Sequence, residues 1–475
     1  MGKEKVKTIF LAMLFVLSVL LTQRLWIIIP SSEIFAKEID NAVEEEFNIY
    51  AEILSPQSYV YNFGGGYHTI LFTDPNDTWS EVVRIIDDFT EKGFTYETLN
   101  IEQWQDANEY KSVKLRFSFP VPLELFYSDF GSWNIGENLS DIDNLIMPAT
   151  DGSVIYIADK SKGIYLKLKG EPIAGDIASK IDEVEALPHT DYFRTEDILG
   201  IETDVLLPIN FEEGISTTEV ATEMDVSDKA QITAMAGRIF GETFDFVKKI
   251  EETDGSVFYI SNYGEKVLKI QSDGLLEYTE MIEKQGQPLN VTLLEALSRS
   301  VAFVKNHGGW PAGAYLAGSE EIEKSGVKGY RFYFGYKING YQVSYGEGAG
   351  AISIDVYGND VAYYKRRVFR EKMNIQFQGE TSYDSILLPQ KAIDRNLREI
   401  AAAYIVDNDL EIENISMDQL LFDILRAIDS IQILYYLDEG AGMERLNPVW
   451  RIAIEKRVYY CNIVDGEMLY RTRNE

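Results

Sequence analysis

The sequence contains very few of the residues that most often carry metal or redox chemistry. Its 475 residues include one cysteine, Cys461, and three histidines, His68, His189 and His307. A single cysteine excludes an intrachain disulfide framework and a cysteine-rich zinc site. The histidines lie in far-apart segments without an HExxH motif, so capping or hydrogen-bonding roles are favoured over a zinc site or a catalytic triad. We therefore predict no catalytic residues, no metal site and no cofactor.

Positive charge is also scarce. The chain carries 44 Lys and Arg residues against 77 Asp and Glu residues, which gives a formal net charge of −33. The first 30 residues hold four cations and one anion, a net +3, so the rest of the chain carries −36. A surface this acidic repels phosphate backbones and anionic lipid headgroups. The composition thus argues against nucleic-acid binding and against charge-driven binding to a membrane surface.

The one long apolar run lies at the amino terminus. Residues 8–29 are long enough, as a helix of about 33 Å, to cross a hydrocarbon core of about 30 Å. Arg24 lies near the outer end of this run, where its guanidinium can reach the interface, and Trp26 suits the same interface as an aromatic anchor. Ile34 stands two residues before Ala36, which departs from the small-residue pattern of signal-peptide cleavage. A retained signal anchor is favoured over a cleaved signal peptide.

The charges on either side of this run predict its orientation. Three lysines precede it and the acidic bulk follows, so the positive-inside rule places residues 1–7 in the cytoplasm. We predict a single-pass protein of the cell membrane, with residues 8–29 as the transmembrane helix and residues 30–475 outside the cell. Seven cytoplasmic residues cannot form a domain, so a signal to the cytoplasm has to pass through the helix.

One stripe of the predicted helix can contact another transmembrane helix. Leu11, Phe15, Ser18 and Thr22 lie on one face, with the hydroxyl residues toward its outer half. Arg24 is a further candidate partner contact, off this stripe. The alternative, that Ser and Thr bond to their own backbone in a lipid-facing helix, stays open.

The remaining chain is predicted to be a connector followed by three α+β domains. Residues 30–55 are a charged juxtamembrane connector that ends at a proline. An N-terminal extracytoplasmic domain spans residues 56–212, a middle domain, which the resemblance described below implies to be YycI-like, residues 213–375, and a C-terminal domain residues 376–475. In the first of these, apolar residues at helical spacing predict a helix that begins near Thr78, with Glu81 completing a capping box.

The last two domains are predicted to be built of repeated units, each a helix followed by antiparallel strands. Helical periodicity covers residues 228–241, 292–306 and 389–405. β-rich runs separated by glycine turns follow each of these helices. Helices and antiparallel strands in this order predict an α+β fold. Such a fold does not by itself decide the function.

Four short motifs resemble functional sites incompletely. Ser325–Lys328 matches S-x-x-K, but Gly326 interrupts it and a loop is predicted. The stretch GEGAGA at 346–351 lacks the last glycine of a dinucleotide loop and runs into a strand, which predicts a hairpin connection. The stretch DNDLEIE at 407–413 lacks the sixth-position glycine of a calcium loop. The glycines at 64–66 predict a turn, with a ligand cradle as the weaker alternative.

The most distinctive stretch outside the membrane is NHGGWP at residues 306–311. Gly308 and Gly309 can end the preceding helix in a left-handed conformation, and Pro311 prevents its continuation. Trp310 can cover this helix end. The alternative is that Trp310 contacts a protein partner, because tryptophan is frequent among the residues that dominate binding energy at interfaces.

Several stretches together resemble the YycH family, the regulator of the YycFG (also called WalRK) two-component system. They are VKTIFLAMLFVLSVLLT, FGGGYHTILFTDPNDTW, VFYISNYGEKVLKIQSDGLLEYTE, EALSRSVAFVKNHGGWP and YRFYFGYKINGYQVSYGEGAGAISIDVYG. The closing NPVWRIAIEKRVYYCNIVDGEML is similar to the ending that YycH shares with its relative YycI. The resemblance covers nearly the whole chain.

The resemblance implies a Gram-positive membrane protein with a three-domain extracytoplasmic part. It implies a regulator, not an enzyme, that joins a YycI-like membrane protein and modulates a YycG-like (WalK-like) sensor histidine kinase through transmembrane helices, in the control of cell-wall homeostasis. The sign of this regulation differs within the family and is left open. The alternative function is a tethered module that binds peptides or wall fragments, including a protease-inhibitor-like role.

Overall fold

The computed structural model describes part of the unit Ile53–Glu475. The described residues are 53–74, 76–126, 135, 139–150, 152–172, 175–211, 215–282, 291–345, 350–372, 386–411, 416–437 and 445–473. The predicted transmembrane helix and its site residues lie outside them, namely Leu11, Phe15, Ser18, Thr22, Arg24 and Trp26. Among the helices of the described ranges, none has both the length and the apolar character needed to span a bilayer.

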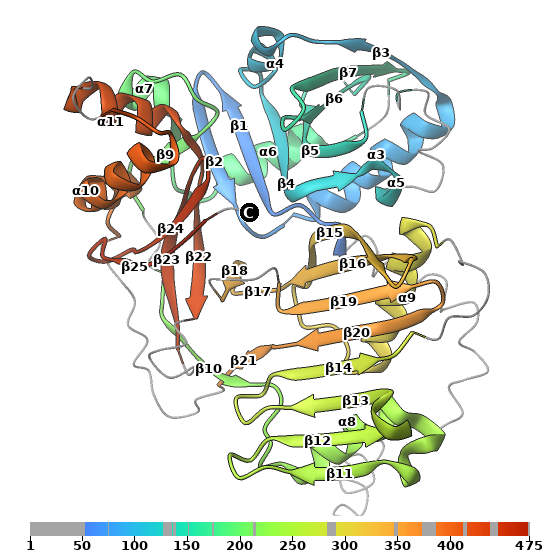
Figure 1. The fold of residues 1–475 in the computed structure, drawn as a ribbon. Helices are drawn as coiled ribbons and strands as arrows, with labels where there is room; N and C mark the ends of the chain where they lie inside the picture. Colours follow the sequence, from blue (N-terminus) through green and yellow to red (C-terminus); the bar gives the residue numbers. More distant parts are fainter. Residues whose placement is uncertain are drawn as a thin grey trace, which may run out of the picture. The chain divides into compact units, whose positions relative to one another are not determined.

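The first sheet is antiparallel, with the strand order β3-β7-β6-β5-β4-β1-β2-β8-β9 (Figure 1). Its strands are β1 (Ser58–Gly64), β2 (Tyr67–Leu71), β3 (Phe94–Thr98), β4 (Ser112–Pro122), β5 (Asp141–Pro148), β6 (Val154–Asp159), β7 (Ile164–Gly170), β8 (Tyr192–Arg194) and β9 (Leu206–Pro208). Its helices are α3 (Thr78–Lys92), α4 (Ile101–Ala107), α5 (Leu123–Phe126), α6 (Ile177–Glu185) and α7 (Thr195–Leu199). Helix α6 packs on β1, β4 and β5, and α3 packs beside α6. The predicted turn at residues 64–66 is confirmed, because all three glycines have positive φ angles between β1 and β2.

The second sheet consists of two successive helix-and-strand units joined edge to edge. Its antiparallel strand order is β11-β12-β13-β14-β20-β19-β16-β15. The first unit contains α8 (Lys229–Phe240), η3 (Gly241–Phe246), β11 (Lys248–Glu251), β12 (Val257–Ser261), η4 (Asn262–Gly264), β13 (Lys266–Ile270) and β14 (Leu276–Glu280). The second contains α9 (Leu293–Asn306), β15 (Tyr315–Lys324), β16 (Val327–Gly335), β19 (Ile352–Tyr357) and β20 (Asp360–Arg366). Strands β14 and β20 pair to make the two units one sheet.

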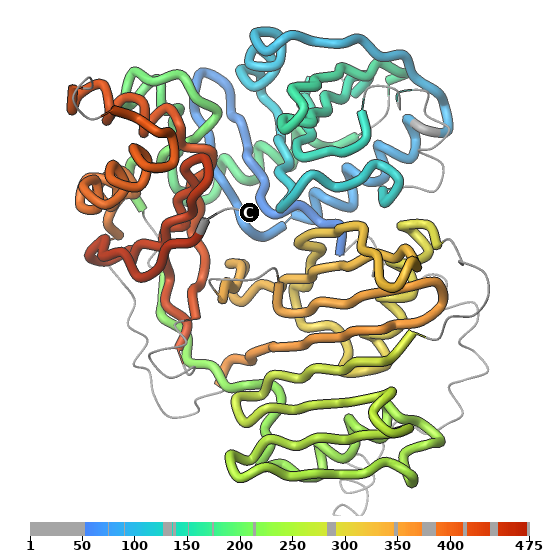
Figure 2. Tube along the Cα trace, viewed as in Figure 1, coloured from blue at the N-terminus to red at the C-terminus, as the bar shows by residue number. Residues whose placement is uncertain are grey.

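The third sheet combines strands from distant parts of the chain. Its order is β17-β18-β22-β23-β10-β21, and β24 and β25 extend it from β23. These elements are β10 (Thr218–Thr222), β17 (Lys337–Ile338), β18 (Tyr341–Ser344), β21 (Phe369–Glu371), α10 (Pro389–Asp407), α11 (Met417–Arg426), β22 (Ile428–Leu437), β23 (Arg445–Ile454), β24 (Arg457–Asn462) and β25 (Met468–Arg473). Figure 2 shows the green segment of β10 meeting the orange segment of β21. The α+β class is confirmed, whereas the domain boundaries at residues 212 and 375 stay predictions.

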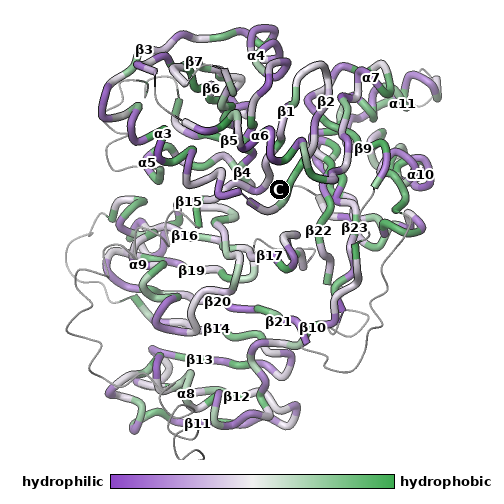
Figure 3. Tube along the Cα trace, turned by 180° about the vertical axis from the view of Figure 1, so that it is seen from behind, coloured by the Kyte–Doolittle hydropathy of each residue, from purple (hydrophilic) through white to green (hydrophobic). Residues whose placement is uncertain are grey.

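Each sheet has apolar residues of its own. Figure 3 shows hydrophobic residues spread over the strands and helices of all three sheets instead of gathered in one of them. In the second sheet, helix α9 packs on β16, β19 and β20, and all six residues of β19 are buried. In the third, a buried cluster joins β22, β23 and β24, consisting of Leu434, Tyr436, Val449, Ala453, Val458 and Tyr460.

Local sequence signals explain where helix α9 begins and ends. Thr292 and Glu295 form the predicted capping box, in which each side chain bonds the other residue's backbone N–H. At the other end, Gly309 has a φ of 75° and its N–H donates to the carbonyl of Val304 at 2.9 Å. His307 caps the same end, with Nδ1 2.8 Å from the carbonyl oxygen of Phe303. The predicted helix end at NHGGWP is confirmed.

A buried ion pair joins the second and third sheets beside this helix end. The guanidinium of Arg366, in β20, donates to both carboxylate oxygens of Glu223, which follows β10, at 2.7 and 3.0 Å. The side chains of Arg366 and Glu223 are only 1 % and 6 % exposed. Arg366 also donates to the carbonyl of Gly309 at 2.8 Å, so one side chain bonds both a buried carboxylate and a carbonyl just beyond the end of α9.

The predicted start of α3 is correct, but its predicted cap is wrong. Thr78 is the first residue of the helix instead of its N-cap, and its hydroxyl lies 2.8 Å from the hydroxyl of buried Tyr61. The carboxylate of Asp74 accepts from the N–H groups of Thr78 and Trp79 at 2.7 and 2.6 Å. A capping box needs its side chain at the N-cap, and here that position is held by Asp77 in the left-handed region.

Candidate functional site

A cavity of about 530 Å³ lies where segments of all three sheets come together. The first sheet contributes residues of β1, β2, β4 and β5, the second contributes β15 and β16, and the third contributes β18, β22, β23 and β24. Its volume lies within the roughly 300–1,000 Å³ of typical small-molecule sites. We call it the central cavity.

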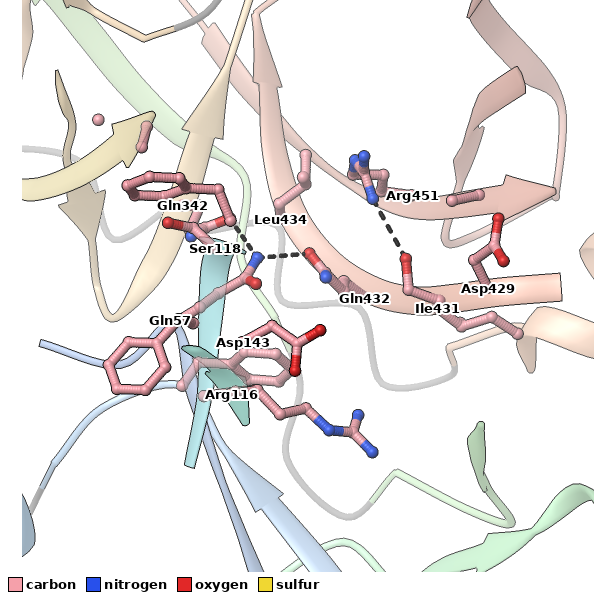
Figure 4. Close-up of a pocket in the computed structure, with 18 of the residues that line it drawn as sticks. Gln57, Arg116, Ser118, Asp143, Gln342, Asp429, Ile431, Gln432, Leu434 and Arg451 are labelled. Atoms are coloured by element: carbon pink, nitrogen blue, oxygen red, sulfur yellow. Dashed lines mark hydrogen bonds between the residues drawn. The ribbon is translucent and has the colours of Figure 1, made fainter. Parts of the chain in front are cut away.

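Three glutamines connect the strands around the central cavity (Figure 4). Nε2 of Gln57, just before β1, donates to Oε1 of Gln342 in β18 at 2.8 Å. The same nitrogen donates to Oε1 of Gln432 in β22 at 2.7 Å. Gln57 thus bridges two strands that are parallel neighbours in the third sheet.

A half-buried lysine reinforces this junction. Nζ of Lys337, in β17, donates to the carbonyl oxygens of Phe72, Gln57 and Pro56 at 2.9, 3.2 and 3.4 Å. Burial lowers the pKa of Lys337 to about 8, although the nearby Asp74 carboxylate opposes the shift. The three carbonyls belong to the segments that enter β1 and leave β2, so Lys337 links the ends of these two strands of the first sheet to the third.

Charged side chains of both signs line the rest of the central cavity (Figure 4). Arg116 and Asp143 come from the first sheet, and Asp429 and Arg451 come from β22 and β23 of the third. Burial lowers the pKa of Arg116 and raises the pKa of Asp143 and Asp429. The shifts in pKa indicate that the charged forms of these three side chains are incompletely solvated. A polar ligand in the cavity could therefore accept hydrogen bonds from the arginines and donate hydrogen bonds to the aspartates.

The described part of the cavity does not assemble a nucleophile with a base. The hydroxyl of Ser118 donates to the carbonyl of Leu316 at 2.8 Å and so serves as a structural link. Cys461 is fully buried against Asn396, and burial raises the pKa of its thiol to about 12, which keeps it protonated. Within the ranges that the structure describes, no three His, Cys, Asp or Glu side chains are placed to hold a metal ion.

The residues singled out from sequence lie in separate places. Trp310 is half-buried and packs edge-on against Phe334 of β16, with ring centroids 4.9 Å apart, and its predicted cover of the end of α9 stays a prediction. Its partner contact stays a prediction. Asp407, in the calcium-like stretch, pairs with Arg457 instead, with Oδ1 2.9 Å from Nη2. Ser325 and Gly326 form the tight turn between β15 and β16, as the loop prediction required.

Sequence reasoning missed the residues that build the central cavity. Gln57, Lys337 and Gln432 belong to no motif, and they meet only because strands far apart in the chain become neighbours. The one available signal was the Asn339-Gly340 pair, a typical two-residue hairpin turn that places β17 and β18 together.

The comparisons with known proteins concern the fold. No protein-family model matches the chain, and no curated protein matches it. Among solved structures, the fold is similar to that of YycH from Bacillus subtilis, with a TM-score of 0.52 and 14 % sequence identity. The match covers 86 % of this chain and 96 % of that chain. The resemblance found in the sequence is thereby confirmed at the level of the fold.

Proposed function

We propose that this chain is a membrane-anchored regulator of a sensor histidine kinase in a YycFG-like (WalRK-like) system that controls cell-wall homeostasis. The observation that carries the proposal is the YycH fold, which covers 86 % of the chain. The apolar run at residues 8–29 supports the anchor. The proposed partners are a YycG-like kinase and a YycI-like membrane protein, and the proposed location of the chain beyond residue 29 is outside the cell.

The proposed mechanism couples the outer part of the chain to the anchor helix. A partner or ligand changes the output of the kinase only if it binds one arrangement of the assembly better than another. The central cavity is suited to such a role, because residues from three sheets line it. A ligand bound there would therefore favour one arrangement of the sheets.

Replacing residues 8–29 with an unrelated anchor of equal length tests the proposal. We expect loss of kinase control although the outer part stays intact and exported, because the contacts with the helices of the kinase are removed. Kinase output is measured with a reporter of the response regulator. An unchanged output would contradict the proposed route through the membrane.

Milder variants test the predicted contact face. The double variant Ser18→Leu with Thr22→Leu, and separately Arg24→Leu, should weaken association in a membrane two-hybrid assay, because interhelical hydrogen bonds are lost. The matched control is Val16→Leu with Val19→Leu, which lie about 100° around the helix from both the stripe and Arg24 and should keep full association. If the stripe variants associate as strongly as the control variant in the two-hybrid assay, the stripe is ordinary lipid-facing surface.

The second candidate is a tethered module that binds peptides or wall fragments, and the central cavity favours it. Such a module would keep its activity as soluble residues 37–475, whereas a regulator that needs its helix would not. Co-purification of partners with the full-length and soluble forms separates the two functions.

A further inference from the structure

A second cavity lies wholly within the first sheet and its helices. It has a volume of about 420 Å³ and is lined by residues of β1, β2, β4, α4, β8 and the segment before β9. We call it the β4 cavity. Its buried floor includes His68 and Lys114, and its rim includes the exposed residues Glu102, Asp106 and Glu202.

The floor of the β4 cavity contains a buried lysine. Lys114, in β4, is only 3 % exposed. Its Nζ donates to Oδ1 of Asn108 at 2.9 Å and lies 5.8 Å from the centre of the Trp104 ring. Burial lowers the pKa of Lys114 well below its usual value, although the Asp204 carboxylate opposes the shift. A negative charge in the cavity would therefore stabilise its ammonium form.

Lys114 and Arg116, the two cations of the floor, lie near the carboxyl group of Asp204. Lys114, with Nζ 3.8 Å from Oδ1 of Asp204, shares that carboxylate with Lys160. Arg116 reaches only the backbone carbonyl of Asp204, with its Nη2 at 3.4 Å. Desolvation opposes ionisation of Asp204, but attraction to Lys114, Lys160 and Arg116 outweighs it and lowers the pKa of this carboxyl. Asp204 thus interacts with three cations, and Asp143 adds a smaller attraction to Lys114. An anion placed between Lys114 and Arg116 would be attracted by both.

The floor also presents a hydrogen-bond acceptor without a partner. His68 is 2 % exposed, and its Nδ1 lies 2.6 Å from Oδ1 of Asn62. Since Nδ2 of Asn62 donates to Ser112, Oδ1 is the acceptor, and Nδ1 of His68 carries the proton. The remaining lone pair, on Nε2, has no partner among the described residues. A buried acceptor of this kind gains from a ligand N–H or O–H.

The rim has the opposite charge. Glu102 and Asp106 from α4, together with Glu196 and Glu202, line the exposed part of the cavity. A ligand with two negative ends would be repelled there, whereas an ammonium group would be attracted. The ligand therefore needs a negative end for the floor and a positive end for the rim.

We propose that the β4 cavity binds a short peptide with free termini, its carboxylate at Lys114 and Arg116, a peptide N–H at Nε2 of His68, and its ammonium group at the acidic rim. Each of the three ligand groups matches one separately observed feature of the wall. The inference does not rest on the proposed regulatory function, because peptide binding and kinase control are measured separately.

Calorimetric titration of the purified full-length chain in detergent tests the proposal, with alanyl-alanine in its L,L and D,D forms as probes. We expect one of the two dipeptides to bind, and its C-terminal amide to bind at least 10-fold more weakly because it lacks the carboxylate. The N-acetyl form should bind several-fold more weakly because it lacks the ammonium group. Absence of binding by both dipeptides at about 10 mM, or equal binding of acid and amide, would overturn the proposal.

Variants of the rim and the floor locate the site. The exposed pair Glu102→Gln with Asp106→Asn should weaken the binding of the free dipeptide several-fold and leave that of the N-acetyl form unchanged. The matched control, Glu91→Gln, removes an exposed carboxylate of α3 outside the cavity and should change neither. Lys114→Met should abolish the preference for the acid over the amide. If Lys114→Met fails to fold, the rim double variant and the comparison of the dipeptide acid with its amide still test the proposal. A rim double variant that binds the free dipeptide as tightly as the wild type would show that the dipeptide does not bind in the β4 cavity.

Discussion

Among single residues, the polar side chains inside the protein show most clearly which contacts hold its parts together and which polar atoms lack a partner. Lys337 donates to three carbonyls, and Arg366 serves both a carboxylate and a helix end. Nε2 of His68, in contrast, has no partner in the described part of the chain. Because burial of an unsatisfied polar atom is costly, such an atom points either to a ligand or to a cost in stability.

Protonation of His68 predicts a loss of stability in acid. Burial, aided by Arg194, Lys114 and Arg116, lowers the pKa of His68 from 6.5 to about 4. Between these values the unfolded chain binds a proton that the folded chain does not, so the free energy of unfolding falls as the pH decreases from 6.5 to 4. The loss should reach about 3 kcal/mol. Urea unfolding at a series of pH values measures it.

The variant His68→Gln should remove this part of the pH dependence. The matched variant Ile70→Val, in the same strand, should lower the free energy of unfolding by about 1 kcal/mol without removing a titrating group. Its free energy of unfolding should therefore change with pH as that of the wild type does. Identical slopes for His68→Gln and the wild type would show that the histidine titrates normally in the folded chain.

Among the helices and strands, the start of α3 shows how a local pattern can identify an element and miss its cap. Asp77 has a φ of 53°, a left-handed conformation that side chains with a Cβ rarely adopt. The helix tolerates it because Asp74, one turn earlier, accepts from its first N–H groups. The two aspartates thus have opposite effects on stability.

Two substitutions separate these effects. Asp74→Ala removes both bonds to the helix start and should destabilise the protein by about 1–2 kcal/mol. Asp77→Gly relieves the left-handed strain and should stabilise it by up to about 1 kcal/mol, reduced by the lost bond to Ser80. Thermal unfolding of both variants measures the two changes. A loss of equal size in each would mean that Asp77 is the true cap.

The sequence predicted elements better than it predicted their assembly. Helices α3, α8, α9 and α10 and most long strands follow from periodicity and glycine turns, which act over a few residues. Helix α11 and the short strands β10 and β21 were missed. Two or three ladder pairs hold β10 to each of its neighbours, and the partner strands lie far away in the chain. The central cavity depends on the pairing of β18 with β22, and the β4 cavity depends on the pairing of β1 with β4 and of β2 with β8. These strands are far apart in the chain, so no local pattern revealed Gln57, Lys337 or the β4 floor.

Within the described part of the molecule, buried polar contacts help to join the sheets. Glu223 leaves the third sheet and meets Arg366 of the second, while exposed Arg370 of β21 reaches the same carboxylate at 2.5 Å. Removal of one partner from a buried pair leaves an uncompensated charge, whereas removal of both does not.

The variant Arg366→Met should therefore lower the free energy of unfolding by about 3 kcal/mol, because Glu223 stays buried and the end of α9 loses a donor. The double variant Arg366→Met with Glu223→Leu should recover part of that loss. Lys365→Met, which removes the neighbouring cation of the same strand, is the control and should change stability little. Urea unfolding of the three proteins gives the comparison, and a single variant as stable as the control would show that the pair does not join the sheets.

The position of β10 between β21 and β23 also constrains the order in which the protein can fold while the chain is synthesised and exported. Strand β10 is synthesised early, but its partner β23 follows more than 200 residues later. At typical translation speeds the wait lasts roughly ten to forty-five seconds. During that interval the second sheet can already be complete while one edge of β10 stays open to foreign strands. A nascent chain stalled before residue 445 should thus be a better substrate for chaperones than its length alone would suggest.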